Sequence, residues 1–406
     1  MKIHATIRRL KRNAHAYGAG VFVIGLFSVA YFTVPNILPL SYSSSADSAS
    51  LQSAAPEEKK TFIVTHKETP EPVKAIYMTQ CVAGTPSIRD GLVRLIEDTE
   101  LNSVVIDIKD YSGTVVFESG HPLLKDTVGA GCRAPDIREF ISTLHEKGIY
   151  VIGRITVFQD PYYTKLRPDL AVKRLSDTDA VWKDYKGLSF IDVGAKEFWD
   201  YIVAIGEESY ALGFDELNFD YIRFPSDGNM NDVYYPFSEE MITIDPDTGK
   251  AKALREFFAY LQNSLQPTGA KLSADLFGMT MTNPDDLNIG QILEYAAPYF
   301  DYIAPMVYPS HYPRGFNGWE NPNEHVYGVV NFSMQKGVER MIMASTTPSK
   351  LRPWLQDFDY GGIYGTEEVQ AQMQATYDAG LTSWMLWDPS NRYTKDALRT
   401  DESAEI

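Results

Sequence analysis

The sequence predicts a (β/α)₈ barrel preceded by an N-terminal transmembrane helix and a flexible linker. Eight short apolar segments recur between positions 74 and 388 of the 406-residue chain, and amphipathic segments lie between them. Three amphipathic segments end in a glycine (Gly148, Gly213 or Gly380) that is followed at once by an apolar segment. Glycine suits the left-handed residue that ends a helix, and such tight junctions are typical of parallel α/β proteins. Eight alternating strand and helix units favour a closed barrel.

The expected strands are assigned from runs of apolar and β-branched residues. They are residues 74–79, 103–109, 149–157, 214–220, 271–276, 301–308, 351–357 and 382–388. Residues 340–347 are an alternative for the seventh strand, but the apolar pattern leading into them is helical and continuous. A doubly wound open sheet is the alternative fold. Such sheets commonly carry a glycine-rich phosphate loop after the first strand, and this sequence has none there.

Amphipathic helices are expected between the strands, with apolar residues at three- and four-residue spacing. The first two follow Thr85-Pro86 and Ala134-Pro135, and proline suits the first turn of a helix. The others are indicated by apolar stripes within residues 198–212, 254–261, 289–293, about 323–343 and about 366–379.

Composition divides the chain into five segments. These are a basic tail (1–16), a transmembrane anchor (17–35), a flexible linker (36–72), the barrel (73–398) and a C-terminal tail (399–406). The anchor is expected because Tyr17 to Val34 holds no charged residue, and about eighteen apolar residues is at the short end of a membrane span. The linker is rich in Ser and Ala at first, a composition that cannot bury a core.

The basic residues before the apolar run predict a single-pass protein with a cytoplasmic N-terminus and a barrel outside the cytoplasm. A cleaved signal peptide, with Ala46 or Ala49 near the cleavage site, is the alternative and would give a secreted protein. The apolar run exceeds the roughly 7–15 residues usual in signal peptides, so we favour the anchor. The net charge of -17 argues against nucleic acid as a main partner.

No cofactor and no metal ion are expected. Cys81 and Cys132 are the only cysteines, too few for a thiolate zinc site or an iron–sulfur cluster. They could form a disulfide or be two unrelated thiols. The histidines show no metal-binding spacing. The acidic loop 226–248 could hold Ca²⁺, but its Asp-Pro-Asp-Thr-Gly sequence is more simply a turn.

The segment 213–225, GFDELNFDYIRFP, is the most informative part of the sequence. Side chains of a strand alternate between its two faces, so Glu216, Asn218 and Asp220 share one face. Polar groups along one face of a core strand are costly unless they are satisfied or used. A carboxylate at the C-terminal end of a barrel strand lies where α/β barrels place catalytic groups.

Neighbouring strands also end in polar residues. Those expected to face the barrel axis on strands two to five are Asp107, Lys109, Arg154, Glu216, Asn218, Asp220, Ser273 and Asp275. An ion-pair network that fills the top layer of the barrel is one interpretation. An active site is the other, and we prefer it because isolated buried ion pairs often fail to offset their desolvation.

Two carboxyl groups on adjacent strands are the minimum machinery for glycoside hydrolysis. Asp220 and Asp275 are the best pair. Arg154 and Arg223 would keep Asp220 ionised, as a nucleophile or electrostatic stabiliser, and the charge of Asp220 would help Asp275 keep its proton as the acid. Asp357 and Asp388 are alternative acids.

The later strands are expected to form a carbohydrate-binding wall, because aromatic rings with polar tips suit sugars. Its residues are Tyr308, His311, Trp354, Gln356, Trp387 and Asp388, and Asp107, Lys109, Arg154, Asn218 and Arg223 are expected to contact substrate beside the acids. Two functions remain open: a membrane-anchored extracytoplasmic glycoside hydrolase and a non-catalytic barrel that binds glycan at the cell envelope.

Several long motifs resemble a known family, the glycosyl hydrolase domain of bacterial and archaeal surface proteins. They are VVIDIKD (104–110), YVIGRITVFQDP (150–161), GFDELNFDYIRFP (213–225), APMVYPSHY (304–312), LRPWLQDF (351–358) and WMLWDPSNRY (384–393). The resemblance implies a TIM barrel distantly similar to the α-amylase-like hydrolases. It also implies that the aspartate of strand four, Asp220, is the nucleophile, and it leaves the sugar undefined.

Overall fold

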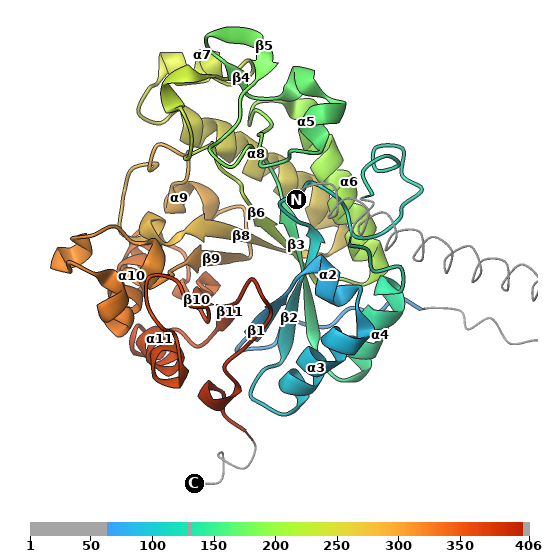
Figure 1. Ribbon diagram of the computed structural model, residues 1–406, viewed down its shortest axis with the longest axis vertical. Helices are drawn as coiled ribbons and strands as arrows, with labels where there is room; N and C mark the ends of the chain where they lie inside the picture. Colours follow the sequence, from blue (N-terminus) through green and yellow to red (C-terminus); the bar gives the residue numbers. More distant parts are fainter. Residues whose placement is uncertain (1–62, 129–131, 401–406) are drawn as a thin grey trace, which may run out of the picture. The chain divides into compact units, whose positions relative to one another are not determined.

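The computed structural model describes residues 63–128 and 132–400. Eight parallel strands close a barrel in the order β1-β11-β10-β9-β8-β6-β3-β2, and helices surround it (Figure 1). The barrel strands are β1 (Lys74–Met78), β2 (Ser103–Lys109), β3 (Tyr150–Thr156), β6 (Glu216–Asp220), β8 (Lys271–Phe277), β9 (Tyr302–Met306), β10 (Trp354–Gln356) and β11 (Trp384–Trp387). The predicted barrel and all eight predicted strands are confirmed, with ends that differ by up to three residues.

The helices include all those that the apolar stripes predict, with one exception, and three short ones that no stripe predicts. They are α2 (Gln80–Ala83), α3 (Pro86–Glu97), α4 (Ile137–Glu146), α5 (Tyr163–Leu166), α6 (Lys196–Leu212), α7 (Glu239–Ile244), α8 (Gly249–Leu265), α9 (Leu293–Ala296), α10 (Val326–Met343) and α11 (Thr366–Asp378). The stripe at 289–293 is the exception, because only α9, a single turn, forms there. Residues 340–343, part of the rejected alternative for strand seven, belong to α10.

Alternation along the strands builds two apolar clusters. Ile76, Val104 and Ile106 point outward and pack with the helices in the larger cluster. Ala75, Tyr77 and their inward-facing counterparts on five other strands form the smaller one. Because these residues come from strands all around the ring and still pack together, the smaller cluster is the interior of the barrel. Burial of each large aliphatic side chain stabilises the fold by about 1.5–3 kcal/mol.

Gly148, Gly213 and Gly380 all adopt positive φ angles after their helices, as the sequence predicts. At Gly213, the end of α6, φ is 114°. An L-residue with a side chain rarely adopts that conformation, and an added Cβ would lie 3.1 Å from Cγ2 of Ile141. This glycine allows the chain to leave α6 and enter β6 within three residues, which places Asp220 at the top of the barrel.

The long connections after β3 and β6 form a small antiparallel sheet that the sequence analysis does not predict. Its strands are β4 (Lys173–Arg174), β5 (Asp177–Val181) and β7 (Val233–Tyr234), in the order β5-β4-β7. It lies at the top of the view in Figure 1, beside α5 and α7. Two of its strands have only two residues, and such short strands leave no periodic signal.

The acidic loop 226–248 is held by protein contacts. Asp232 accepts hydrogen bonds from the Ser176 amide (2.7 Å) and Arg174 Nε (3.0 Å), and Asp245 accepts from the Thr248 amide and hydroxyl. Within residues 63–128 and 132–400, no group of three acidic, His or Cys side chains is arranged to hold a metal ion. The contacts between Asp245 and Thr248 are those of a turn, as the sequence predicts for Asp-Pro-Asp-Thr-Gly.

Residues just before β1 cross the N-terminal end of the barrel. The amide of Lys67 donates to Asp215 Oδ1 (2.7 Å), and Thr69 Oγ1 lies 3.0 Å from the hydroxyl of Tyr150. The predicted anchor, residues 17–35, lies outside the described residues. Among the helices that the structure does describe, none combines the length and apolarity needed to cross a membrane.

Cys81 and Cys132 form a disulfide, which resolves the two alternatives left by the sequence. The bond joins α2, which follows β1, to the segment that leads into α4. It closes a loop with a sequence separation of 51 residues. In an unfolded chain a cross-link of this kind removes conformational freedom, so it stabilises the folded barrel.

Replacing both cysteines by serine is expected to lower the free energy of unfolding by about 2–4 kcal/mol. Urea denaturation of the two proteins measures the difference. A thiol reductant should bring the wild-type midpoint down to that of the variant and leave the variant unchanged. Equal midpoints without reductant would contradict a stabilising role for the disulfide.

Candidate active site

The polar side chains on the inward face of β6 are buried at successive levels, from the N-terminal end of the barrel to its C-terminal end. Glu216 accepts two hydrogen bonds of 3.0 Å from Arg352 and one of 3.1 Å from Tyr150. Two residues further along the strand, Asn218 is fully buried. Asp220 ends the strand, in register with Thr156 of β3. The lower carboxylate thus belongs to a structural ion pair, and the upper one lies at the C-terminal end of the strand.

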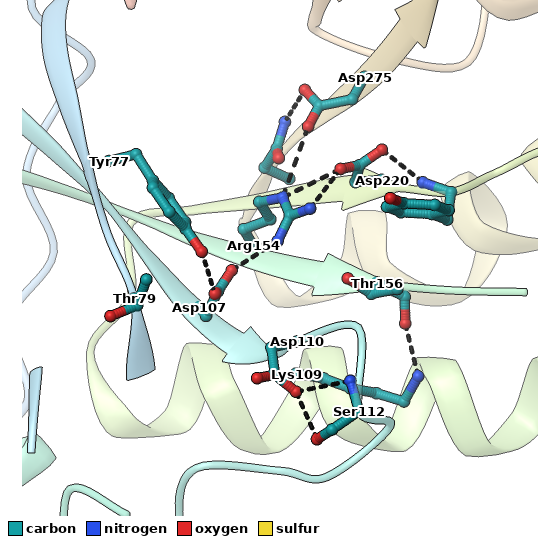
Figure 2. A network of polar contacts seen from close by, with 12 residues as sticks. Tyr77, Thr79, Asp107, Lys109, Asp110, Ser112, Arg154, Thr156, Asp220 and Asp275 are labelled. Carbon is teal, nitrogen blue, oxygen red and sulfur yellow. Dashed lines mark hydrogen bonds and ion pairs between the residues drawn. The ribbon is translucent and has the colours of Figure 1, made fainter. Parts of the chain in front are cut away.

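Arg154 of β3 is the centre of the top layer. Its guanidinium donates to Asp220 Oδ2 from Nε (3.1 Å) and Nη2 (2.5 Å), and to Asp107 Oδ1 from Nη1 (2.6 Å). Nε also lies 3.9 Å from Asp275 Oδ2. Figure 2 shows the three carboxylates arranged around this one side chain. One buried cation therefore faces three acidic groups.

Asp275 of β8 is held by two uncharged donors. Asn218 Nδ2 donates to its Oδ1 at 2.9 Å, and Trp354 Nε1 donates to the same oxygen at 2.8 Å. Burial, and then the nearby charge of Asp220, raise the pKa of Asp275 well above its ordinary value. Asp275 therefore keeps a proton at a pH at which a solvated aspartate would be ionised.

Asp107 of β2 is a third titratable group in the same layer. It accepts hydrogen bonds from Arg154 and from the hydroxyl of Tyr77. Burial raises its pKa to about 6, and the charge of Arg154 opposes that rise. The ring of Tyr77 stacks on Trp387, with centroids 3.9 Å apart. The first and last strands of the barrel thus close the network.

Lys109 does not join this network, which corrects the expectation that it faces the barrel axis beside Asp107. Its Nζ contacts Asp160 (2.8 Å) and the carbonyl of Thr156 (2.6 Å) and is fully buried. Figure 2 shows it apart from the Arg154 cluster. The register between β2 and β3 shifts between Asp107 and Lys109, so the simple two-residue alternation fails there.

Arg223 and Gln356 are buried and engaged by the protein. Arg223 donates to the Phe224 carbonyl (3.0 Å), and its guanidinium lies 5.0 Å from the Phe277 ring centroid. Gln356 donates to the Phe358 carbonyl (2.9 Å) and accepts from the hydroxyl of Ser310 (2.8 Å). These two side chains hold the loops after β6, β9 and β10.

Both alternative acids accept hydrogen bonds from residues that follow β11. Asp388 accepts from the amide of Ser390, at 2.5 Å. Asp357 accepts from the amide and hydroxyl of Thr394 (2.9 and 2.7 Å). Arg154 instead pairs with Asp107, Asp220 and Asp275.

A series of ring contacts begins at Tyr308 and ends at the exposed Tyr360. Tyr308 is buried, and the charges of Asp275 and Asp220 help burial to raise its pKa. Its ring lies 5.7 Å from Phe358 and 5.4 Å from His311, an exposed residue whose ring lies 5.9 Å from Tyr360. The sequence analysis includes Tyr308 and His311 but misses the other two rings.

Phe358 and Tyr360 follow β10 directly in the sequence. The rule that loops after barrel strands build the site, applied to the residues beyond strand seven, would have found them. Tyr77, the third missed ring, has no such signal because it lies within a strand whose inward face is otherwise apolar.

A closed ring of parallel strands, with two acidic side chains on adjacent strands at its C-terminal end, is an arrangement that glycosidases use. The chain belongs to the family described as "Putative glycosyl hydrolase domain", whose model matches residues 75–393. This membership confirms the family that the sequence motifs resemble, and it supports a glycosidase-like function.

Solved structures share the fold. The glycoside hydrolase domain of PgaB (BpsB) from Bordetella bronchiseptica is 14% identical, with a TM-score of 0.58, over 81% of this chain and 99% of that chain. A hypothetical protein from Ruminiclostridium thermocellum is 32% identical over 49% of this chain and 96% of that chain, with a TM-score of 0.41. No curated protein matches the chain. The Bordetella likeness supports the barrel fold.

Because the pKa of Asp107 is raised in the folded protein, its contribution to the free energy of unfolding should depend on pH. In the unfolded chain its pKa is near 3.8, and in the folded protein it is about 6. Stability contributed by the neutral group is complete below the lower value and is lost as the pH rises through the higher one. A difference of about two pKa units corresponds to about 3 kcal/mol.

We therefore expect Asp107→Asn to become more stable relative to the wild type as the pH rises from 4 to 7, by up to about 3 kcal/mol. Urea unfolding at each pH measures this difference. The substitution also weakens contacts to Tyr77 and Arg154, but that loss has no comparable pH dependence. A difference that stays constant over this range would show that Asp107 is not perturbed.

Proposed function

We propose that this chain is a membrane-anchored, extracytoplasmic glycoside hydrolase that cleaves a poly- or oligosaccharide with the carboxyl groups of Asp220 and Asp275. One observation supports this most directly: Arg154 lies beside two carboxyl groups, and burial and the nearby charge of Asp220 favour a proton on Asp275. Arg154 Nε lies 3.1 Å from Asp220 Oδ2 and 3.9 Å from Asp275 Oδ2. An acid and an ionised partner are what glycosidic bond cleavage requires.

The distances from the two carboxyl groups to Arg154 are compatible with a double-displacement reaction. Because both oxygens lie close to the same nitrogen, they cannot be farther apart than the two distances taken together. That limit excludes most of the separation of about 6.5–9.5 Å found in inverting enzymes and admits the separation of about 5–5.5 Å found in retaining ones. We therefore assign Asp220 as the nucleophile.

In this mechanism Asp275 gives its proton to the glycosidic oxygen while the bond from that oxygen to the anomeric carbon breaks. An oxygen of Asp220 forms a covalent bond to the anomeric carbon. A water molecule then attacks that carbon, gives a proton to the Asp275 carboxylate and releases Asp220. Asp220 has more of its side chain exposed (7%) than Asp275 (1%), as expected of the group that bonds to substrate.

Carbohydrate as the substrate class is supported by the rings beside the acids. Trp387 is half-buried, stacks on Tyr77 and lies 5.0 Å from the Arg154 guanidinium. Location outside the cytoplasm is supported by the disulfide, since disulfides persist in oxidising compartments. The membrane anchor rests on the composition of residues 17–35.

Asp220→Asn and Asp275→Asn are each expected to lower kcat on a polysaccharide by about 10²–10⁴-fold. The two differ on aryl glycosides with an activated leaving group such as dinitrophenol. Such a group departs without protonation, so Asp275→Asn should keep most of its kcat/KM there, which reports formation of the covalent intermediate, although its kcat falls because the second step loses its base. Asp220→Asn should lose both. Steady-state rates on both substrate types measure the contrast. Wild-type-like turnover by Asp220→Asn would refute the assignment.

A non-catalytic glycan-binding barrel is the second candidate, because Asp275 is 1% exposed and already accepts two hydrogen bonds. Both functions predict binding to glycan, and only the hydrolase predicts turnover. Binding of a wall polysaccharide with no reducing ends released by the wild type, across a panel of glycans and aryl glycosides, would favour this second function.

Tyr360 offers a test of the sugar-binding wall. It is 62% exposed and contacts His311. Tyr360→Ala should weaken binding of a hexasaccharide by up to about tenfold, because ring stacking contributes about 0.5–1.5 kcal/mol. Calorimetric titration of the Asp220→Asn protein with and without this change measures it. Tyr327→Ala, an exposed tyrosine of α10 that bonds to Asp378, is the control.

A further inference from the structure

We propose that Trp354 is a positioning residue for the catalytic acid: with Asn218, it fixes the acidic proton on Oδ2 of Asp275, the oxygen that faces Asp220. This inference deepens the proposed function and rests on it. It also changes the role expected for Trp354, which the sequence analysis assigns to the sugar-binding wall.

The argument starts from what an indole can do. Trp354 Nε1 lies 2.8 Å from Asp275 Oδ1, and an indole nitrogen donates a hydrogen bond but cannot accept one. Oδ1 must therefore act as an acceptor. The carbonyl oxygen is the better acceptor of a neutral carboxyl group, so this contact favours the carbonyl at Oδ1 and the proton on Oδ2.

Asn218 reinforces the same arrangement. Its side chain contacts Oδ1 at 2.9 Å and the hydroxyl of Ser273 at 3.0 Å. An amide can in principle present either its oxygen or its nitrogen. Because Trp354 makes Oδ1 an acceptor, the amide presents its NH₂ group to that oxygen. Its own oxygen is left without a protein partner among the described residues.

The remaining oxygen of Asp275 faces the reacting groups. Oδ2 lies 3.9 Å from Arg154 Nε, the atom that also bonds to Asp220. Trp354 is fully buried and so is shielded from contact with a sugar. Its hydrogen bond to Asp275 is the interaction through which it acts on the site.

Removing this donor should change the pKa of Asp275 in a predictable direction. A hydrogen bond to a carboxylate is stronger than one to the neutral acid and so lowers the pKa. Trp354→Phe keeps most of the ring and removes the N–H group. We expect the pKa of Asp275, already raised by burial, to rise further by about one unit. The alkaline limb of the kcat/KM profile should move to higher pH, and kcat should fall about tenfold.

Trp384→Phe is a matched control. Trp384 is also fully buried in a barrel strand, and its Nε1 donates at 2.8 Å, but to Tyr377 on α11. This variant loses a comparable hydrogen bond away from the carboxylates, so its pH profile should equal that of the wild type. Asn218→Ala removes the second donor to Oδ1 and should shift the limb in the same direction as Trp354→Phe.

The decisive measurement does not require turnover. Carbon-13 labelling of the aspartate carboxyl groups in the full chain, with Asp275→Asn used to assign the signal, reports the pKa of Asp275 by NMR titration. A rise in Trp354→Phe without a rise in Trp384→Phe supports the proposal even if no glycan is hydrolysed, in which case only the proposed reaction fails. An unchanged or lowered pKa in folded Trp354→Phe and Asn218→Ala overturns it.

Discussion

The guanidinium of Arg154 is the interaction on which the top of the barrel depends. It binds Asp220 and Asp107 directly and lies within ion-pair distance of Asp275. All four groups are buried, so losing the cation would leave uncompensated charge in the interior, which costs about 3–5 kcal/mol. One cation cannot balance three carboxylates, and the excess charge adds to burial in holding a proton on Asp275.

Charged side chains at different depths of the barrel have different numbers of oppositely charged partners. At the bottom, Glu216 and Arg352 neutralise each other. Behind the sheet, Lys109 and Asp160 form a second closed pair. At the C-terminal ends of the strands, three acids surround the one cation Arg154. This imbalance, rather than the presence of charge, distinguishes the candidate site from an ion-pair network that merely fills the core.

Much of the site could be predicted from the sequence, because period-two alternation and strand order bring Asp220, Asp275 and Arg154 to one end of one ring. The prediction failed where alternation failed, at the register shift that turns Lys109 away. It also misjudged Trp354. An aromatic residue near a strand end suggests a sugar platform, and a sequence does not show which way an indole N–H points.

The sequence by itself determined the fold class, the eight strands and the acidic pair, because these depend on local periodicity and on residue types at strand ends. Only the tertiary structure decided which oxygen of Asp275 accepts hydrogen bonds, that Cys81 and Cys132 are joined, and that Tyr77 reaches Asp107. Those facts depend on distances between side chains far apart in the chain, and such distances are set only when the ring of strands closes.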